Sequence, residues 1–120
     1  MRIPPPTSWP DEDELEISPA VVAALRAAGE SFLLVDCREE DEWNLCRIEG
    51  AEFMPLSRFA EVARQRFTDP AERIVIHCHH GMRSAQAAGF LRHFGMHRAW
   101  SMAGGIEAWS VEIDPAVPRY

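Results

Sequence analysis

The sequence predicts an α/β domain with a mostly parallel central sheet flanked by helices. Two short apolar runs, at residues 32–35 and 74–76, have the composition of strands that are buried on both faces. Segments of helical period lie between and after these runs, and this alternation of strands and helices gives parallel sheets. A length of 120 residues with 47% hydrophobic content suits one domain with a single core.

The chain is expected to divide into three parts: an extended acidic and proline-rich segment at 1–16, a folded domain at 17–110 and a tail at 111–120. The acidic run at residues 11–14 is typical of a solvated segment, and Trp9 before it is a candidate for docking on the domain. Prolines in the tail indicate an extended path along the surface.

The first helix is predicted by Ser18 and Pro19, a serine N-cap followed by proline at the first helical position, and it is expected to end at Gly29. The later elements follow in the same alternating way. They are a turn with a brief strand at 50–55, a helix at 57–67, a helix from about 83 to 95, a strand at 99–102 and a last helical turn opened by Gly104 and Gly105.

Polar residues follow the first predicted strand, at the point where ligand crevices form in parallel sheets. Asp36 and Arg38 come directly after residues 32–35, so their position makes them candidate supporting residues of a site. The sequence favours a simpler role for them, an ion pair that holds the loop in shape. We interpret Trp43 as a packing residue in preference to a wall of the crevice.

The second predicted strand leads into the stretch that carries the chemistry. Cys78 lies at the carboxyl end of this strand, just before the helix predicted from Arg83. N–H groups at a helix N-terminus lack helical partners and the helix dipole adds positive potential, so a thiolate is stabilised there. In such a position the pKa of a thiol falls by one to several units from about 8.5. Cys78 is therefore a candidate catalytic nucleophile.

Net charge and cysteine content argue against several other classes of protein. A formal net charge of −7 disfavours a nucleic-acid or anionic-membrane partner. No run approaches the roughly 18 apolar residues of a membrane span, and the N-terminus has no stretch of signal-peptide type, so a cytoplasmic location is expected. Three cysteines without CxxC spacing fit reduced thiols better than a disulfide framework.

Five ordered blocks of the chain resemble the rhodanese family of sulfurtransferases. They are Ile17-Ser18-Pro19, Leu34-Val35-Asp36-Cys37-Arg38-Glu39, Ile48-Glu49-Gly50-Ala51, Cys78 to Ser84, and Ala103-Gly104-Gly105-Ile106-Glu107-Ala108-Trp109. The resemblance implies a three-layer rhodanese-like fold with no metal or other cofactor. It also implies that Cys78 accepts a sulfane sulfur as a persulfide. Thiosulfate is the usual assay donor of such domains, and cyanide, a thiol or a sulfur-carrier protein is the acceptor.

The residues after the cysteine would form the active-site loop and persulfide cradle: His79, His80, Gly81, Met82, Arg83 and Ser84. Their backbone N–H groups would stabilise the persulfide anion in the manner of an oxyanion hole. Arg83 either attracts the anionic donor or pairs with an acidic side chain such as Asp36. His79 and His80 are expected at the rim, where their protonation would modulate donor binding. For His80 we favour the role of a plain exposed loop residue.

The length of this loop distinguishes sulfurtransferases from phosphatases of the same fold. Four residues lie between Cys78 and Arg83, the size associated with sulfurtransferases, whereas phosphatases of the same fold have one residue more. The larger loop makes room for a tetrahedral phosphate. Ser84 occupies the position that a phosphatase arginine would take, so the sequence favours sulfur transfer over phosphatase activity.

The chain departs from the family pattern at two places. Residues 46–50 read Cys-Arg-Ile-Glu-Gly where many relatives have Gly-His-Ile-Pro-Gly, which alters the crevice wall. His79 stands where active members often have arginine, which removes a permanent charge. The tail at 114–120 is similar to the ends of rhodanese domains fused to enzymes that activate sulfur-carrier proteins. This likeness suggests a biosynthetic sulfur relay.

Three rival functions are considered. A metal site would use residues 77–80 or His93 with the histidine four residues on, but their spacing matches no structural zinc pattern. A non-catalytic binding module of the same fold is disfavoured because Cys78 is retained. Thiol-redox chemistry such as arsenate reduction would need Cys37 or Cys46 as a resolving thiol, and a buried apolar role is favoured for both.

Overall fold

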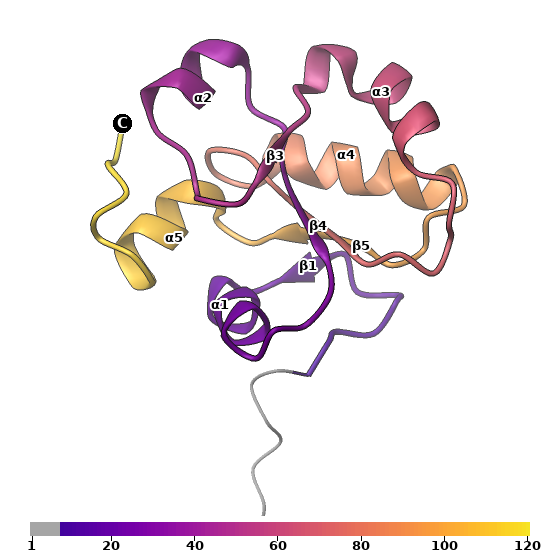
Figure 1. Ribbon diagram of the computed structural model, residues 1–120, viewed down its shortest axis with the longest axis horizontal. Helices are drawn as coiled ribbons and strands as arrows, with labels where there is room; N and C mark the ends of the chain where they lie inside the picture. The colour runs from indigo at the N-terminus through magenta and orange to yellow at the C-terminus, as the bar shows by residue number, and fades with distance from the viewer. Residues whose placement is uncertain (1–7) are drawn as a thin grey trace, which may run out of the picture.

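A five-stranded sheet runs through the middle of the protein in the computed structural model, which describes residues 8–120 (Figure 1). All pairings are parallel and the strand order is β1-β5-β4-β2-β3. The strands are β1 (Glu16–Ile17), β2 (Leu33–Asp36), β3 (Glu52–Phe53), β4 (Ile74–His77) and β5 (Ala99–Met102). The predicted α/β class with a parallel sheet is confirmed.

Helices cover both faces of this sheet. They are α1 (Pro19–Ala27), α2 (Glu40–Leu45), the short 3-10 helix η1 (Leu56–Arg58), α3 (Phe59–Arg66), α4 (Met82–His93) and α5 (Gly105–Glu112). Helices α3 and α4 lie on one side of the sheet, and α1 and α5 lie on the other (Figure 1). Within residues 8–120 no helix is both long enough and apolar enough to cross a membrane.

The central strand β4 shows how the two cores are divided. Ile74 and Ile76 point into the core beneath α3 and α4, whereas Val75 points into the core beneath α1 and α5. All four residues of β4 are buried, as expected for a strand covered on both faces. Because β4 is the middle strand of the five, its carboxyl end lies at the centre of one edge of the sheet.

Helix α2 and strand β1 are elements that the sequence pattern did not predict. Helix α2 contains no buried residue, so it has no apolar stripe to reveal it. Its start is fixed instead by a capping box, in which the side chains of Glu39 and Glu42 each accept a hydrogen bond from the other residue's backbone. Strand β1 is only two residues long, and helix α5 is longer than the single turn expected.

The described part of the N-terminal segment packs against the sheet. Trp9 stacks on Trp100 at a ring-centroid distance of 5.1 Å, so its predicted docking is borne out in the structure. The side chains of the acidic run are exposed, but the Asp11 carbonyl accepts a hydrogen bond from the Trp100 indole. Residues 1–7, expected to be extended, lie outside the described residues.

Candidate active site

Cys78 lies in the loop between β4 and α4, and the loop wraps around its sulfur. The backbone N–H of Gly81 donates to Sγ at 3.0 Å and that of Ser84 at 3.4 Å. Gly81 has a φ of 111°, a left-handed conformation that glycine adopts readily and that turns the chain back into α4. The structure thus brings the predicted nucleophile to a helix N-terminus, and two of the predicted N–H groups converge on it.

Hydroxyl groups complete the surroundings of the sulfur on its buried side. Ser84 Oγ lies 3.5 Å from Cys78 Sγ and 2.7 Å from Ser101 Oγ, which comes from strand β5. All three side chains are buried. Because a hydroxyl can turn its proton toward a thiolate, Ser84 adds a third donor to the Cys78 sulfur.

A second thiol contacts Cys78 from the end of the neighbouring strand β2. Cys37 is completely buried and hydrogen-bonds the Cys78 sulfur. This bond, with the hydroxyl and N–H of Ser84 and the N–H of Gly81, lowers the pKa of Cys78 well below that of an ordinary thiol, although burial opposes it. The same contact and burial raise the pKa of Cys37. The negative charge of the pair is therefore held on Cys78.

Helix α5 supports the loop that holds Cys78 through hydrogen bonds to its backbone. Its first N–H groups donate to loop carbonyls, Ile106 to Cys78 at 2.8 Å and Glu107 to His79 at 3.1 Å. Gly105 at the start of α5 lies so close that an added Cβ would overlap both of these carbonyl oxygens. Two helix N-termini therefore meet at the loop, α4 through the Cys78 sulfur and α5 through the loop carbonyls.

Asp36 and Arg38 form a fully buried ion pair beside the loop. The Arg38 guanidinium donates through Nε and Nη2 to the carboxylate of Asp36, with the Nη2 to Oδ2 distance at 2.8 Å. Arg38 also donates to the carbonyl of Cys46 and to the hydroxyl of Tyr120. The arrangement matches the ion-pair interpretation favoured from the sequence, because every contact of Arg38 holds a segment of chain in place.

Arg83 has a different partner from the one considered in the sequence. Its guanidinium makes a two-pronged contact with Glu42 of helix α2, at 2.6 and 2.9 Å, while Asp36 is occupied by Arg38. Arg83 holds the pKa of Glu42 down at about 2, so this ion pair is charged at neutral pH. The ion-pair alternative considered for Arg83 is therefore found in the structure, but with Glu42 in place of Asp36, because the unpredicted helix α2 brings a carboxylate to the loop.

Aromatic rings form the outer wall of the site. His79 stacks on His80 at 3.9 Å and on Tyr120 at 4.0 Å between ring centroids. Burial and the neighbouring His80 lower the pKa of His79, which favours its neutral form. The hydroxyl of Tyr120 donates to Glu42 at 2.7 Å. His80 and Met82 are exposed, as the sequence analysis expected for His80.

The C-terminal tail runs along the surface, as predicted, but it is anchored there by one buried residue. A turn interrupts the extended path at residues 115–117, where Val117 is buried and its carbonyl accepts a hydrogen bond from Ser110. The tail then runs from α5 toward α2, where the C-terminus lies in Figure 1. Tyr120 reaches the active-site loop because these contacts hold the tail against the domain.

A pocket of about 400 Å³ opens over the sulfur. It is lined by Cys78, His79, His80, Met82, Arg83 and Gln86. Residues that the sequence analysis missed also touch this region: Glu42, Ser101 and Tyr120. Only Ser101 carried a local signal, as a lone polar residue within an apolar strand, whereas Glu42 and Tyr120 reach the site through folding alone.

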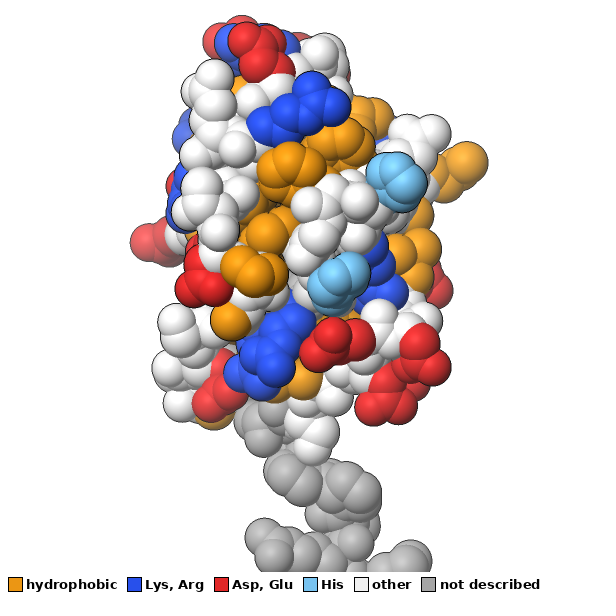
Figure 2. Space-filling model, turned by 90° about the vertical axis from the view of Figure 1, so that its right-hand side faces the viewer, with side chains coloured by type: hydrophobic (Ala, Val, Ile, Leu, Met, Phe, Trp, Pro, Cys, Tyr) orange, Lys and Arg blue, Asp and Glu red, His pale blue; other side chains and the backbone are white. Residues whose placement is uncertain are grey.

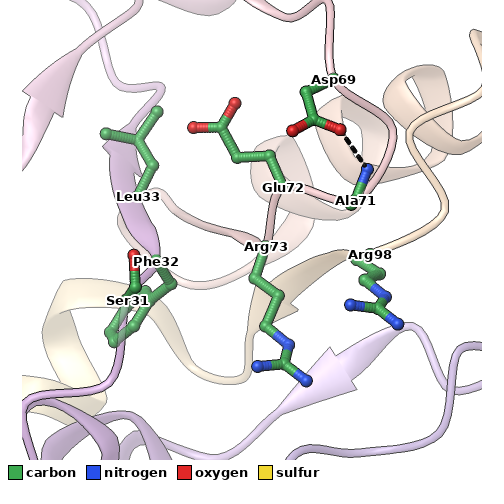
Figure 3. A pocket seen from close by; sticks show the side chains of 8 residues that line it. All are labelled: Ser31, Phe32, Leu33, Asp69, Ala71, Glu72, Arg73 and Arg98. Carbon is green, nitrogen blue, oxygen red and sulfur yellow. Dashed lines mark hydrogen bonds between the residues drawn. The ribbon is translucent and has the colours of Figure 1, made fainter.

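A larger hollow of about 590 Å³ lies at the opposite edge of the sheet, where β2, β4 and β5 begin (Figure 3). Its lining mixes charges of both signs, with Arg73 and Arg98 facing Asp69 and Glu72. Figure 2 looks onto this end of the molecule, where basic, acidic and hydrophobic side chains lie side by side. The lining of this hollow includes the hydroxyl of Ser31 but none of the three cysteines.

The histidines considered as metal ligands do not form a metal-binding group in the described part of the chain. Among residues 8–120 no group of three or more His, Cys, Asp or Glu side chains is arranged to hold a metal ion. His77 is fully buried, and its Nε2 lies 3.8 Å from the Asp36 carboxylate without a hydrogen bond. Burial lowers the pKa of His77, so this side chain is a neutral part of the wall behind Cys78.

Comparisons with known proteins agree with this geometry. A model of the rhodanese-like domain matches residues 18–112. Thiosulfate sulfurtransferase GlpE of Pseudoalteromonas translucida is 30% identical over 90 residues, covering 75% of this chain and 84% of that protein. The probable adenylyltransferase/sulfurtransferase MoeZ of Mycobacterium tuberculosis is 29% identical over 93 residues, or 78% of this chain. This chain spans only 24% of MoeZ and less than a third of several other curated relatives.

Among solved structures, the human single-domain sulfurtransferase TSTD1 superimposes with a TM-score of 0.70. The superposition covers 81% of this chain and 96% of that chain, at 24% sequence identity. At this level of identity the likeness shows a common fold. The three-layer arrangement inferred from the sequence blocks is thereby confirmed.

Proposed function

This chain belongs to the rhodanese-like domain family, and from that premise we propose that it is a sulfurtransferase that carries a sulfane sulfur on Cys78. The support is of two kinds. Similar chains include proteins named as sulfurtransferases, GlpE and MoeZ among them. The observation that carries the proposal is the convergence of the Gly81 and Ser84 N–H groups on the Cys78 sulfur, because this is an anion site built around a nucleophile.

The first step forms the persulfide. The Cys78 thiolate attacks the outer sulfur of thiosulfate, a new S–S bond forms to that sulfur, and the old S–S bond breaks to release sulfite. The negative charge moves from Cys78 to the transferred sulfur, which occupies the pocket over the loop. The N–H groups at the start of α4 stabilise that charge as they stabilise the thiolate, so the reaction leaves the net charge of the site unchanged.

The second step discharges the sulfur. An acceptor nucleophile, such as cyanide, a thiol or a sulfur-carrier protein, attacks the outer sulfur and the Cys78 thiolate leaves. The low pKa of Cys78 makes it a good leaving group. The two steps together are covalent catalysis with a ping-pong order. MoeZ, which carries both adenylyltransferase and sulfurtransferase in its name, supports a protein acceptor in a sulfur relay.

Donor recognition falls to backbone groups more than to arginine side chains. Arg83 is occupied by Glu42 and Arg38 by Asp36, so both guanidinium groups near the loop are neutralised. His79 favours its neutral form and adds no permanent charge. The loop N–H groups thus supply the main attraction for an anionic donor. All three cysteines are free thiols, which supports action in a reducing compartment such as the cytoplasm.

The test is a steady-state assay with thiosulfate and cyanide, in which sulfite and thiocyanate are both measured. The wild-type protein should release one thiocyanate for each sulfite, with parallel lines in double-reciprocal plots. Cys78→Ser should lose this activity entirely, whereas Cys46→Ser should keep it, because Cys46 lies outside the loop and its sulfur faces the Pro118 carbonyl. Sulfur transfer that persists in Cys78→Ser would contradict the proposal.

A further inference from the structure

Cys37 is a buried thiol that the two-step reaction leaves unused. It follows β2 directly, as Cys78 follows β4, and these strands are parallel neighbours with Asp36 paired to His77. The pairing continues one residue further, because the Cys37 N–H donates to the His77 carbonyl at 3.0 Å. Cys37 and Cys78 therefore occupy adjacent positions in register and point to the same face of the sheet.

Their separation suits a covalent link. Neighbouring strands lie about 4.8 Å apart, and a disulfide requires Cα atoms roughly 4.4–6.8 Å apart. The two side chains belong to the same hydrophobic cluster. Cys37 is 0% exposed and Cys78 is 1% exposed, so both side chains lie in the interior of the domain.

Resting on the sulfurtransferase function proposed above, we infer that Cys37 is a resolving thiol that converts the Cys78 persulfide into a Cys37–Cys78 disulfide and releases the transferred sulfur as hydrosulfide. Cys37 Sγ attacks Cys78 Sγ, an S–S bond forms between the two cysteines, and the bond from Cys78 to the outer sulfur breaks. The proton of Cys37 passes to the departing sulfur. Both cysteines are oxidised by one electron each, and the sulfane sulfur is reduced to sulfide.

No outside oxidant enters this step, because the persulfide itself carries the oxidising equivalents. The disulfide is returned to two thiols by an external thiol reductant such as glutathione, which supplies two electrons and two protons. The outer sulfur of the Cys78 persulfide can thus leave in two ways. A thiophilic acceptor takes the sulfur directly, and when the acceptor is absent Cys37 discharges it as sulfide.

Cys46 provides the contrast within the same chain. It is half-buried after helix α2, and its Sγ lies 3.5 Å from the carbonyl of Pro118. Its backbone carbonyl is held by Arg38, which fixes the segment there. Cys46 is therefore a matched control for Cys37 in the experiment.

The experiment loads the reduced protein with thiosulfate, or with inorganic polysulfide as a second donor, in the absence of acceptor. Released sulfide is measured, and the protein is then denatured and alkylated with iodoacetamide for intact mass. Wild-type protein should release one sulfide and take up a single alkyl group, on Cys46. Cys46→Ser should release one sulfide and take up none. Dithiothreitol should restore all three alkylation sites of the wild type.

Cys37→Ser should keep the sulfur on Cys78, release no sulfide and take up two alkyl groups. A wild-type protein that gains sulfur but keeps three alkylation sites would overturn the inference while leaving the sulfurtransferase proposal in place. If neither the wild type nor Cys37→Ser takes up sulfur from either donor, the proposed function fails and this inference fails with it. The wild-type alkyl count decides the matter even if Cys37→Ser does not fold.

Discussion

The charge on a single sulfur atom depends on a few short contacts. Cys78 is shielded from water, so its thiolate is stabilised by what the protein supplies: N–H groups of Gly81 and Ser84, the hydroxyl of Ser84, and the thiol of Cys37. Each of these donors would be weaker in water, because water competes for the same lone pairs. Removing one of them should therefore have a measurable effect on the pKa of Cys78.

Ser84→Ala removes the hydroxyl donor and leaves the backbone N–H in place. A hydrogen bond to a charged group contributes about 1.5–3 kcal/mol, so the pKa of Cys78 should rise by about one unit or more. Because only the thiolate is alkylated, the midpoint of the pH profile for iodoacetamide alkylation of Cys78 should move upward by the same amount. The profile is measured on the Cys46→Ser background to give a single reactive site.

Ser57→Ala is the matched control for this change. The Ser57 hydroxyl donates to Glu39 at 2.7 Å, away from the sulfur, so the alkylation midpoint should stay at the wild-type value. If Ser84→Ala also kept the wild-type midpoint, the hydroxyl would have no part in stabilising the thiolate.

At the scale of elements, the site depends on how two helices begin. Helix α4 directs its first N–H groups at the sulfur, and helix α5 directs its own at the carbonyls of Cys78 and His79. The loop is held between these two helix starts. Helix α2 contributes in another way, because it positions Glu42 to bind Arg83.

Gly105→Ala should disturb this junction. The added Cβ would overlap the carbonyl oxygens of Cys78 and His79, and the residue has a φ of +61°, which strains any L side chain. We expect the free energy of unfolding to fall by about 2 kcal/mol or more, and the sulfurtransferase activity to fall with it. Urea denaturation followed by circular dichroism gives the first quantity, and the thiocyanate assay gives the second.

Gly89→Ala is the control within a helix. No atom lies within 4 Å of the added Cβ, and Gly89 sits in the interior of α4. Alanine should therefore raise the free energy of unfolding by about 0.5–1 kcal/mol. Equal stability of the two glycine variants would argue that α5 does not support the loop as described.

At the scale of the whole molecule, the C-terminal tail is brought to the edge of the sheet that carries the active-site loop. The tail packs through Val117 and ends with Tyr120 against His79, more than 40 positions away in the sequence. Arg38 and Glu42 both hydrogen-bond the Tyr120 hydroxyl. The last residues of the chain thus act as one wall of the active site.

Tyr120→Ala should loosen this wall. The loss of the stacking contact and of two hydrogen bonds should lower the free energy of unfolding by about 1–2 kcal/mol, measured by urea denaturation. The rate of Cys78 alkylation in the folded protein should increase, because the ring that stacks on His79 is gone. Arg119→Ala, which breaks an exposed ion pair with Glu107, should leave both quantities unchanged. Equal alkylation rates in the two variants would contradict a shielding role for Tyr120.

The sequence by itself determined the parallel α/β sheet, the place of Cys78 at a strand end and the helix that begins beside it. These follow from local patterns, because the apolar runs at β2 and β4 and the serine-proline start of α1 depend on neighbouring residues alone. It also indicated the Asp36–Arg38 pair, which spans only two positions.

Only the tertiary structure decided which distant groups meet at the sulfur. Glu42 binds Arg83 from a helix without an apolar stripe, and Tyr120 reaches His79 from the tail. Cys37 touches Cys78 because the register of β2 against β4 places them side by side. No periodicity in the sequence encodes such contacts, since they are fixed by the packing of whole elements.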